Sequence, residues 1–116
     1  MNSKEMTILA IEALEDKKAE DIKVIDISEI SPIADYFIIA GGNNVSQLQA
    51  LSDNVAEKLG RENVHAKQVE GYNTANWILM DYADIIVHIF DKENRNLYNL
   101  ERLWRDGKEV DIDSLR

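Results

Sequence analysis

A chain of 116 residues is long enough to bury a hydrophobic core, and the absence of cysteine excludes disulfides, thiolate metal sites and thiol catalysis. Its 22 acidic and 13 basic side chains give a formal charge of -9, which argues against binding nucleic acid through a broad basic face and favours a basic protein partner. No apolar run approaches the roughly 20 residues of a membrane span, and the N-terminus lacks the apolar core of a signal peptide, so we expect a soluble cytoplasmic protein.

Residues 1–116 are expected to form one domain with an acidic tail at 107–116. A first amphipathic helix has Ser3 as its candidate cap and Glu5 in its first turn. A second runs from about Val45 to Leu59, with Gly60 as the residue that stops it. A last helix, capped by Asn94 or Asn96, extends through Trp104, whose spacing places it in the core.

Five apolar runs predict strands, and between the helices they give the order α-β-β-α-β-β-β-α. These strands are Ile22–Ile27, Tyr36–Ala40, His65–Val69, Asn76–Asp81 and Ile85–Phe90. The pattern predicts a mixed α/β (α+β) fold, a mixed sheet of about five strands flanked by helices. The last two strands form an antiparallel hairpin, and the strand–helix–strand step permits a right-handed parallel crossover. The tail alternates polar and apolar residues, which leaves open whether it docks on the body.

The stretch Trp77–Phe90 is the centre of this organisation. Both faces of its second strand are apolar, as in a strand at the middle of a sheet. Its side chains with a polar group are the candidate recognition residues: Trp77, Asp81, Tyr82, Asp84 and His88. Trp77 follows a polar loop and suits an interface and a core position equally well. The two aspartates also suit the turn between the strands.

An assembled catalytic site is not evident. Gly41–Asn44 joins a strand to a helix but lacks the lysine of a phosphate-binding loop, so the glycines are better explained by the turn and an asparagine by the cap. Asp26 and Asp35 near strand ends are candidate carboxylates for metal or acid–base chemistry, yet no Asp-x-Asp follows the glycines. His65 and His88 lack further ligands at suitable spacing. We therefore expect no enzyme activity, no metal and no cofactor.

Three blocks of the sequence carry a family resemblance: Ser31–Ile39, Asn76–Phe90 and Arg95–Trp104. With Leu51–Val55 and Val69–Gly71, they resemble the iojap (RsfS) family of ribosomal silencing factors over nearly the whole chain. Two positions depart from the family pattern. Ala83 stands where the family usually has glycine, and Asn76 where an acidic residue is common.

The resemblance implies a nucleotidyltransferase-like fold without the catalytic carboxylates. It implies binding to the large ribosomal subunit through its protein fourteen, steric blocking of subunit joining, and repression of translation under nutrient limitation. Family members are also homodimers. By carry-over, the partner-binding surface contains Trp77, Asp81, Tyr82, Asp84 and His88. Two other classes of function are an enzyme of the nucleotidyltransferase type, using Gly41, Gly42 and scattered aspartates, and a dimeric adaptor without a ribosomal role.

Overall fold

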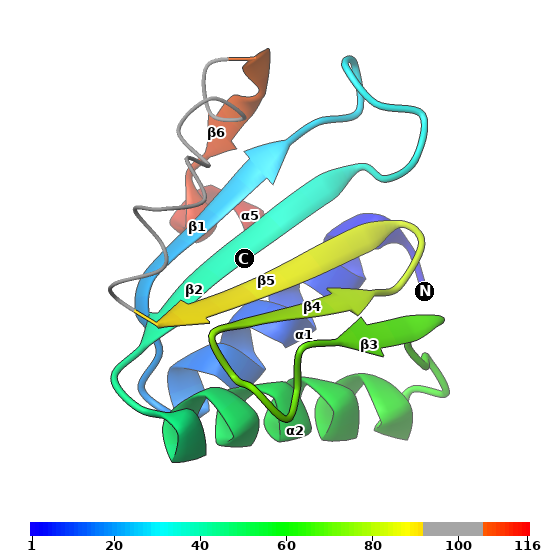
Figure 1. Cartoon of the computed structure of the whole chain (residues 1–116). Coiled ribbons are helices and arrows are strands. Elements are labelled where there is room, and N and C mark those ends of the chain that lie inside the picture. Colours follow the sequence, from blue (N-terminus) through cyan, green and yellow to red (C-terminus); the bar gives the residue numbers. More distant parts are fainter. Residues whose placement is uncertain (92–105) are drawn as a thin grey trace.

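The computed structural model describes residues 1–91 and 106–116, and these residues are organised around a six-stranded mixed sheet (Figure 1). The strand order is β3-β4-β5-β2-β1-β6. The strands are β1 (Glu20–Asp26), β2 (Tyr36–Gly42), β3 (Gln68–Glu70), β4 (Trp77–Asp81), β5 (Ile85–Asp91) and β6 (Lys108–Val110). The central pair, β2 and β5, is parallel, and every other pair is antiparallel. The predicted mixed α/β class is thus confirmed, and the strand beyond the five expected is β6.

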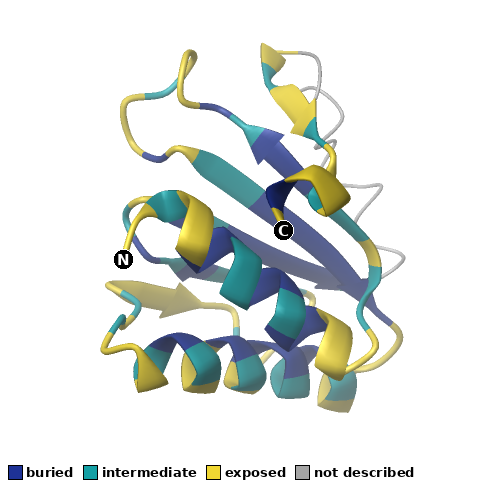
Figure 2. Ribbon diagram, turned by 180° about the vertical axis from the view of Figure 1, so that it is seen from behind, coloured by how far each residue is buried: buried dark blue, intermediate teal, exposed yellow. Residues whose placement is uncertain are grey.

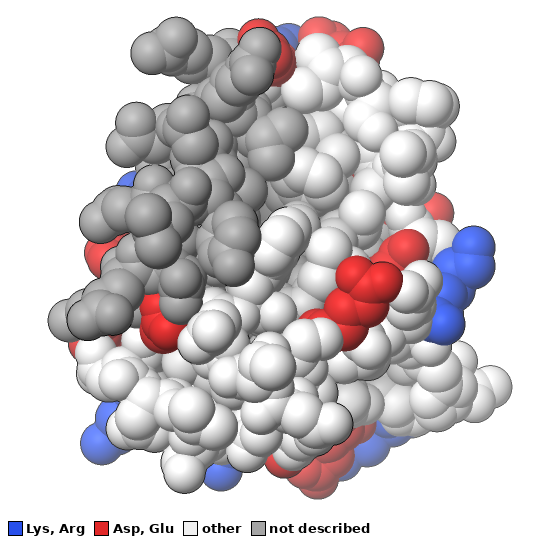
Figure 3. All heavy atoms as spheres, viewed as in Figure 1, with Lys and Arg blue, Asp and Glu red and all other residues white. Residues whose placement is uncertain are grey.

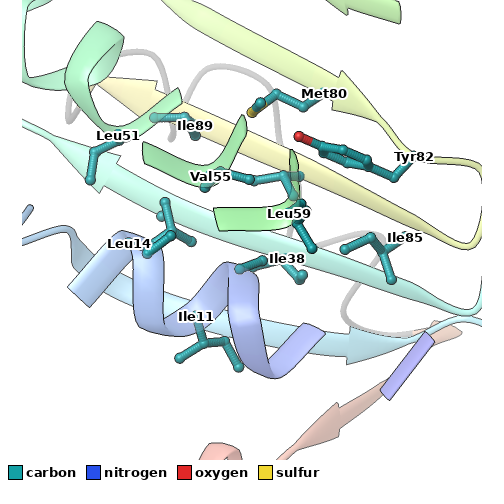
Figure 4. Close-up of a cluster of buried hydrophobic side chains, with 14 of the residues drawn as sticks. Ile11, Leu14, Ile38, Leu51, Val55, Leu59, Met80, Tyr82, Ile85 and Ile89 are labelled. Atoms are coloured by element: carbon teal, nitrogen blue, oxygen red, sulfur yellow. The ribbon is translucent and has the colours of Figure 1, made fainter. Parts of the chain in front are cut away.

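Two long helices cover one face of this sheet. They are α1 (Ser3–Asp16) and α2 (Val45–Arg61), and the short α5 (Ile112–Leu115) lies on the same side. Figure 2 shows that the long helices turn their buried sides toward the strands. The central strands are apolar on this face, and the helices bring apolar stripes to it. Figure 4 shows part of the resulting cluster: Ile11, Leu14, Ile38, Leu51, Val55, Leu59, Met80, Tyr82, Ile85 and Ile89.

The N-cap of the first helix lies one residue earlier than predicted. Asn2, not Ser3, is its N-cap, and the Asn2 side chain accepts a hydrogen bond from the Glu5 amide at 2.8 Å. The Glu5 carboxylate in turn accepts from the Asn2 amide. This reciprocal arrangement needs the glutamate three positions after the cap, which Asn2 satisfies and Ser3 does not.

The second helix also ends differently from the prediction. Gly60 lies inside α2, and the turn that ends the helix is at Asn63, whose φ is 62°. The Asn63 amide bonds to the Gly60 carbonyl, and the Val64 amide bonds to the Leu59 carbonyl at 2.9 Å. This is the Schellman pattern, and asparagine supports it because it tolerates the left-handed conformation.

Three further expectations concern the edges. The third strand is short and begins at Gln68, not His65. The helix expected through Trp104 lies outside the described residues. The tail docks on the body, because β6 pairs with β1 and Leu115 is buried.

Over residues 1–91 and 106–116, no helix combines the length and apolar character required to cross a membrane.

Candidate functional site: the open face of the sheet

Strands β4 and β5 form the predicted antiparallel hairpin. Trp77 lies opposite Phe90, and Asp81 lies opposite Ile86. The turn is closed by a hydrogen bond from the Tyr82 amide to the Ile85 carbonyl at 3.0 Å. This register fixes which side chains share a face, because alternate residues of a strand point to opposite sides of the sheet.

The face turned away from α1 and α2 is defined here as the open face. Its side chains on β2, β4 and β5 are Phe37, Ile39, Trp77, Leu79, Asp81, Ile86, His88 and Phe90. No helix of the described residues covers it. Phe37, Trp77, Leu79 and Ile86 are half-buried, so apolar surface remains accessible there. Figure 3 shows this face, where uncharged surface extends from the centre toward the acidic side chains.

Four rings form an aromatic cluster on the open face, namely Phe37, Trp77, His88 and Phe90. The Trp77 and Phe90 rings stack with centroids 5.4 Å apart and planes 17° apart. The Phe37 ring meets the His88 ring edge to face, with centroids 4.9 Å apart. The Trp77 Nε1–H donates a hydrogen bond to His88 Nδ1 at 3.1 Å. Two of the five predicted site residues, Trp77 and His88, are thus in direct contact.

His88 is a buried polar group within this cluster. Its side chain is 5% exposed, and burial lowers its pKa from 6.5 to about 4, so the imidazole is neutral at neutral pH. Its Nε2 atom is buried and has no hydrogen-bond partner in the described part of the chain. An unsatisfied buried donor of this kind costs about 1–3 kcal/mol. His88, which was expected at the contact surface, is therefore almost fully buried.

Acidic side chains border the apolar part of the open face. Asp81 lies on β4, roughly 13 Å along the strand from Trp77. Glu70 of β3 pairs with Leu79 and therefore shares its face, and Asp84 is exposed in the hairpin turn. Figure 3 shows acidic side chains over β3, β4 and the turn. Asp81 also has a structural role, because its Oδ1 accepts a hydrogen bond from the Ala83 amide at 2.8 Å.

Tyr82 does not belong to this surface. It is 5% exposed and lies in the core on the helix side, where burial raises its pKa to about 12. Figure 4 shows its ring among the core side chains. The reason is the alternation of the strand: Tyr82 follows Ile78 and Met80, which face the helices, whereas Trp77 and Asp81 face the other way. The structure thus separates Tyr82 from the other predicted site residues.

The glycine turn before α2 has a structural role, because its residues cap the helix. Asn44 is the N-cap of α2 and accepts from the Gln47 amide at 2.8 Å, while the Gln47 side chain accepts from the Asn43 amide at 2.7 Å. Gly42 is required by space, because a Cβ there would lie 2.7 Å from a Leu48 methyl carbon. Two amides at this turn, those of Asn43 and Gln47, are therefore already bonded to side chains of the protein.

Asp26 and Asp35 border a cavity of about 280 Å³ that Ser3, Ser28 and Tyr36 also line. Ser28 donates two hydrogen bonds to Asp26, from its hydroxyl at 2.6 Å and its amide at 2.9 Å, and these lower the Asp26 pKa. Within the described ranges, no group of three histidine or acidic side chains is placed to hold a metal ion. Asp26 thus acts as a turn residue.

Sequence reasoning missed part of the open face. Phe37, which belongs to the aromatic cluster, and Ile86 on the same face are half-buried, yet each stands in a continuously apolar run that gave no sign of exposure. The alternation of the strands could have revealed them. Ile86 is two residues from His88 and so faces the same side, and Phe37 lies beside Ile86 across the parallel pair β2–β5.

Comparison with known proteins places the chain in a family. The family model described as "Ribosomal silencing factor during starvation" matches residues 1–116. The ribosomal silencing factor RsfS of Bacillus subtilis is 41% identical over 113 residues, which cover 97% of this chain and 96% of that protein. RsfS of Halalkalibacterium halodurans is 38% identical over 115 residues, covering 99% and 98%.

A solved structure agrees. A crystal structure of a protein from Chromobacterium violaceum superposes with a TM-score of 0.87 at 36% identity, and the match covers 90% of this chain and 88% of that one. Sequence and fold thus point to the same relatives, and the chain belongs to the RsfS family of ribosomal silencing factors.

Proposed function

We propose that this protein docks onto the large ribosomal subunit through its open face and sterically blocks joining of the small subunit, which represses translation when nutrients are short. The observation that carries the proposal is the half-buried Trp77, on a sheet face that no described helix covers. Family membership supports the ribosomal setting, since the relatives are named as ribosomal silencing factors.

The chemistry of the face favours a protein partner. Tryptophan is enriched among residues that dominate binding energy, because it buries a large area and keeps one polar contact. On the same face as Trp77, the apolar side chains Leu79 and Ile86 provide surface to desolvate, and Glu70 and Asp81 provide negative charge at the border. A net charge of -9 repels bare RNA and attracts a basic protein. Protein fourteen of the large subunit is the partner that we propose.

The mechanism is occlusion and requires no catalytic group. A protein bound where the two subunits meet prevents joining if its volume overlaps that of the small subunit. The affinity comes from one aromatic anchor and its apolar surroundings, while the acidic border sets orientation and association rate. This role would place the protein in the cytoplasm with the ribosomal subunits.

Self-association through the same face is a second part of the proposal. An apolar sheet face that binds a partner can also bind a second copy of the chain. Docking and dimerisation would then compete, so the dimer would dissociate on the subunit. Sedimentation of a fluorescently labelled dimer with large subunits tests this, since a dimer that stays intact on the subunit contradicts it.

Co-sedimentation with purified large subunits tests the proposed docking. The variant is Trp77→Ala, and the matched control is Val45→Ala, which truncates a side chain 49% exposed on the helix layer. We expect the wild type and the control to sediment with the subunit and Trp77→Ala to lose at least tenfold in affinity. Circular dichroism establishes that each variant is folded.

A subunit-joining assay by light scattering completes the test. Wild-type protein is expected to reduce joining in proportion to its occupancy of the large subunit, and folded Trp77→Ala to leave joining unchanged. Equal binding by both proteins would place the docking surface elsewhere, and absence of binding by the wild type would refute the proposed function.

A further inference from the structure

The imidazole of His88 has one described hydrogen-bond partner, and that partner is the side chain of Trp77. The indole Nε1–H is only a donor, so the Nδ1 atom that receives it at 3.1 Å carries no proton. The neutral ring must therefore carry its hydrogen on Nε2. This assignment follows from the geometry of the pair.

The Nε2–H contributes nothing that stabilises the sheet. It is buried and without a hydrogen-bond partner among the described residues, which is an unfavourable arrangement for a donor. An aliphatic side chain at this position would avoid that penalty. What the imidazole does provide is an acceptor at the place where the indole N–H points.

Trp77 gains a defined orientation from that acceptor. The indole stacks on Phe90, with ring planes 17° apart, and stacking alone permits the ring to slide and rotate in its plane. The hydrogen bond to His88 Nδ1 removes this freedom, because a hydrogen bond weakens steeply away from a straight line. The half-buried ring is thereby held in one arrangement before any partner arrives.

We propose that His88 is a positioning residue of the docking surface: through Nδ1 it fixes the orientation in which Trp77 is presented, without itself touching the partner. The inference rests on the proposed function, because it concerns the same open face. Holding an anchor side chain in its bound orientation lowers the entropy lost on binding. Release of the indole is expected to weaken affinity for the large subunit by about three- to tenfold.

The test compares two substitutions of His88 with a matched control. His88→Leu removes the acceptor, His88→Asn places an amide oxygen near the position of Nδ1, and His65→Leu changes the only other histidine, which is exposed. The chain has two tryptophans, so the Trp77 indole signal in an NMR spectrum is identified by its loss in Trp77→Phe. Each protein is measured for hydrogen exchange of the Trp77 indole, for thermal unfolding and for affinity to large subunits.

We expect His88→Leu to accelerate exchange of the indole hydrogen at least tenfold and to weaken subunit binding, with thermal stability at pH 7 unchanged or higher. His88→Asn is expected to restore part of both properties, and His65→Leu to resemble the wild type in all three measurements. If His88 had a purely structural role, the affinity of each variant for large subunits would fall only where its thermal stability also fell. That result would overturn the proposal.

A measurement on the wild type makes the outcome independent of how the variants fold. Scalar coupling across the hydrogen bond between Trp77 Nε1 and His88 Nδ1 is expected to be detectable by NMR. Absence of that coupling, or unchanged indole exchange in folded His88→Leu, would refute the positioning role even if docking is sound. Failure of the wild type to bind subunits, with the coupling present, would refute the docking function instead.

Discussion

The two faces of the sheet are built from different side chains. The helix-covered face is mainly aliphatic and closely packed, with Ile38, Val87 and Ile89 of the central strands fully buried beneath α1 and α2. The open face carries the aromatic cluster, a buried imidazole and an acidic border. Aliphatic packing maximises burial without polar groups, whereas aromatic rings with one polar atom suit a surface that must bind and separate. One face thus supplies the packed core, and the other is the face that we propose for recognition.

The hairpin β4–β5 contributes to both faces, and this makes the comparison direct. Tyr82 and Trp77 are large rings with one polar atom, and they are five residues apart, yet they point to opposite sides of the sheet. Tyr82 is enclosed by core side chains, whereas Trp77 keeps an accessible edge. Residue type alone does not decide which face a side chain joins. Its place in the alternation of the strand does.

The largest expected effect is on the helix-covered face. Leu51→Ala removes a fully buried side chain of α2, and the resulting cavity is expected to lower the free energy of unfolding by about 3 kcal/mol. Affinity for the large subunit is expected to stay within twofold at temperatures where the variant is folded. Urea unfolding and co-sedimentation measure the two quantities, and an affinity loss as large as that of Trp77→Ala would erase the distinction between the faces.

The second prediction concerns pH and the imidazole of the open face. Because burial lowers the pKa of His88 from 6.5 to about 4, the unfolded chain binds a proton that the folded chain excludes between these values. Stability is therefore lost as the pH falls through this window, by about 3 kcal/mol in total at pH 4. His88→Leu lacks this contribution.

Urea unfolding of wild type and His88→Leu at pH 7 and pH 4 isolates the effect, because the other groups contribute equally to both proteins. We expect the wild type to lose about 2–3 kcal/mol more than the variant. Parallel pH profiles for the two proteins would show that the imidazole takes up its proton without unfolding.

The third prediction concerns the turn that joins the two halves of the hairpin. Ala83 has a φ of 70°, a left-handed conformation that costs about 1–2 kcal/mol for a residue with a Cβ. Glycine relieves that strain but loses about 0.5–1 kcal/mol through its greater freedom in the unfolded chain. Ala83→Gly is expected to raise the free energy of unfolding by about 0.5–1 kcal/mol, measured by urea titration. A destabilised variant would mean that the turn adopts another conformation in solution.

The smallest effect is predicted for the tyrosine on the core side. Tyr82→Phe keeps the ring and removes only the hydroxyl, so the affinity for large subunits is expected to equal that of the wild type. Trp77→Ala in the same co-sedimentation series shows the loss expected for a true contact residue. If Tyr82→Phe weakened binding as strongly, the Tyr82 hydroxyl would have to reach the partner.

The sequence predicted the arrangement of the main elements because apolar alternation and helical spacing are strong signals in this chain. The hairpin strands were placed within one residue of Trp77–Asp81 and Ile85–Asp91. The short strand β6 was not predicted, because it has only three residues and its pairing with β1 joins chain segments far apart in sequence. Helix ends shifted because Asn2, the N-cap of α1, and Asn63, which follows the C-cap of α2, compete with neighbours of similar propensity.

The candidate site was only partly predictable. The sequence pointed to the block that contains Trp77 and His88. Tyr82 was grouped with them by residue type, although the alternation along the strand places it on the other face. The hydrogen bond between Trp77 and His88 joins diagonal neighbours across the hairpin, since Trp77 is directly opposite Phe90. Such a contact depends on the register of the pair and on both rotamers, which no sequence pattern specifies.

Photo-crosslinking to large subunits tests most directly whether the open face contacts the ribosome. A photoreactive phenylalanine analogue replaces Ile86 on the open face in one protein and Val45 on the helix layer in another. We expect the analogue at position 86 to crosslink to a basic protein of the large subunit and the analogue at position 45 not to crosslink. Crosslinking from position 45 alone, with both proteins folded and bound, would show that the helix layer faces the ribosome and would contradict the account.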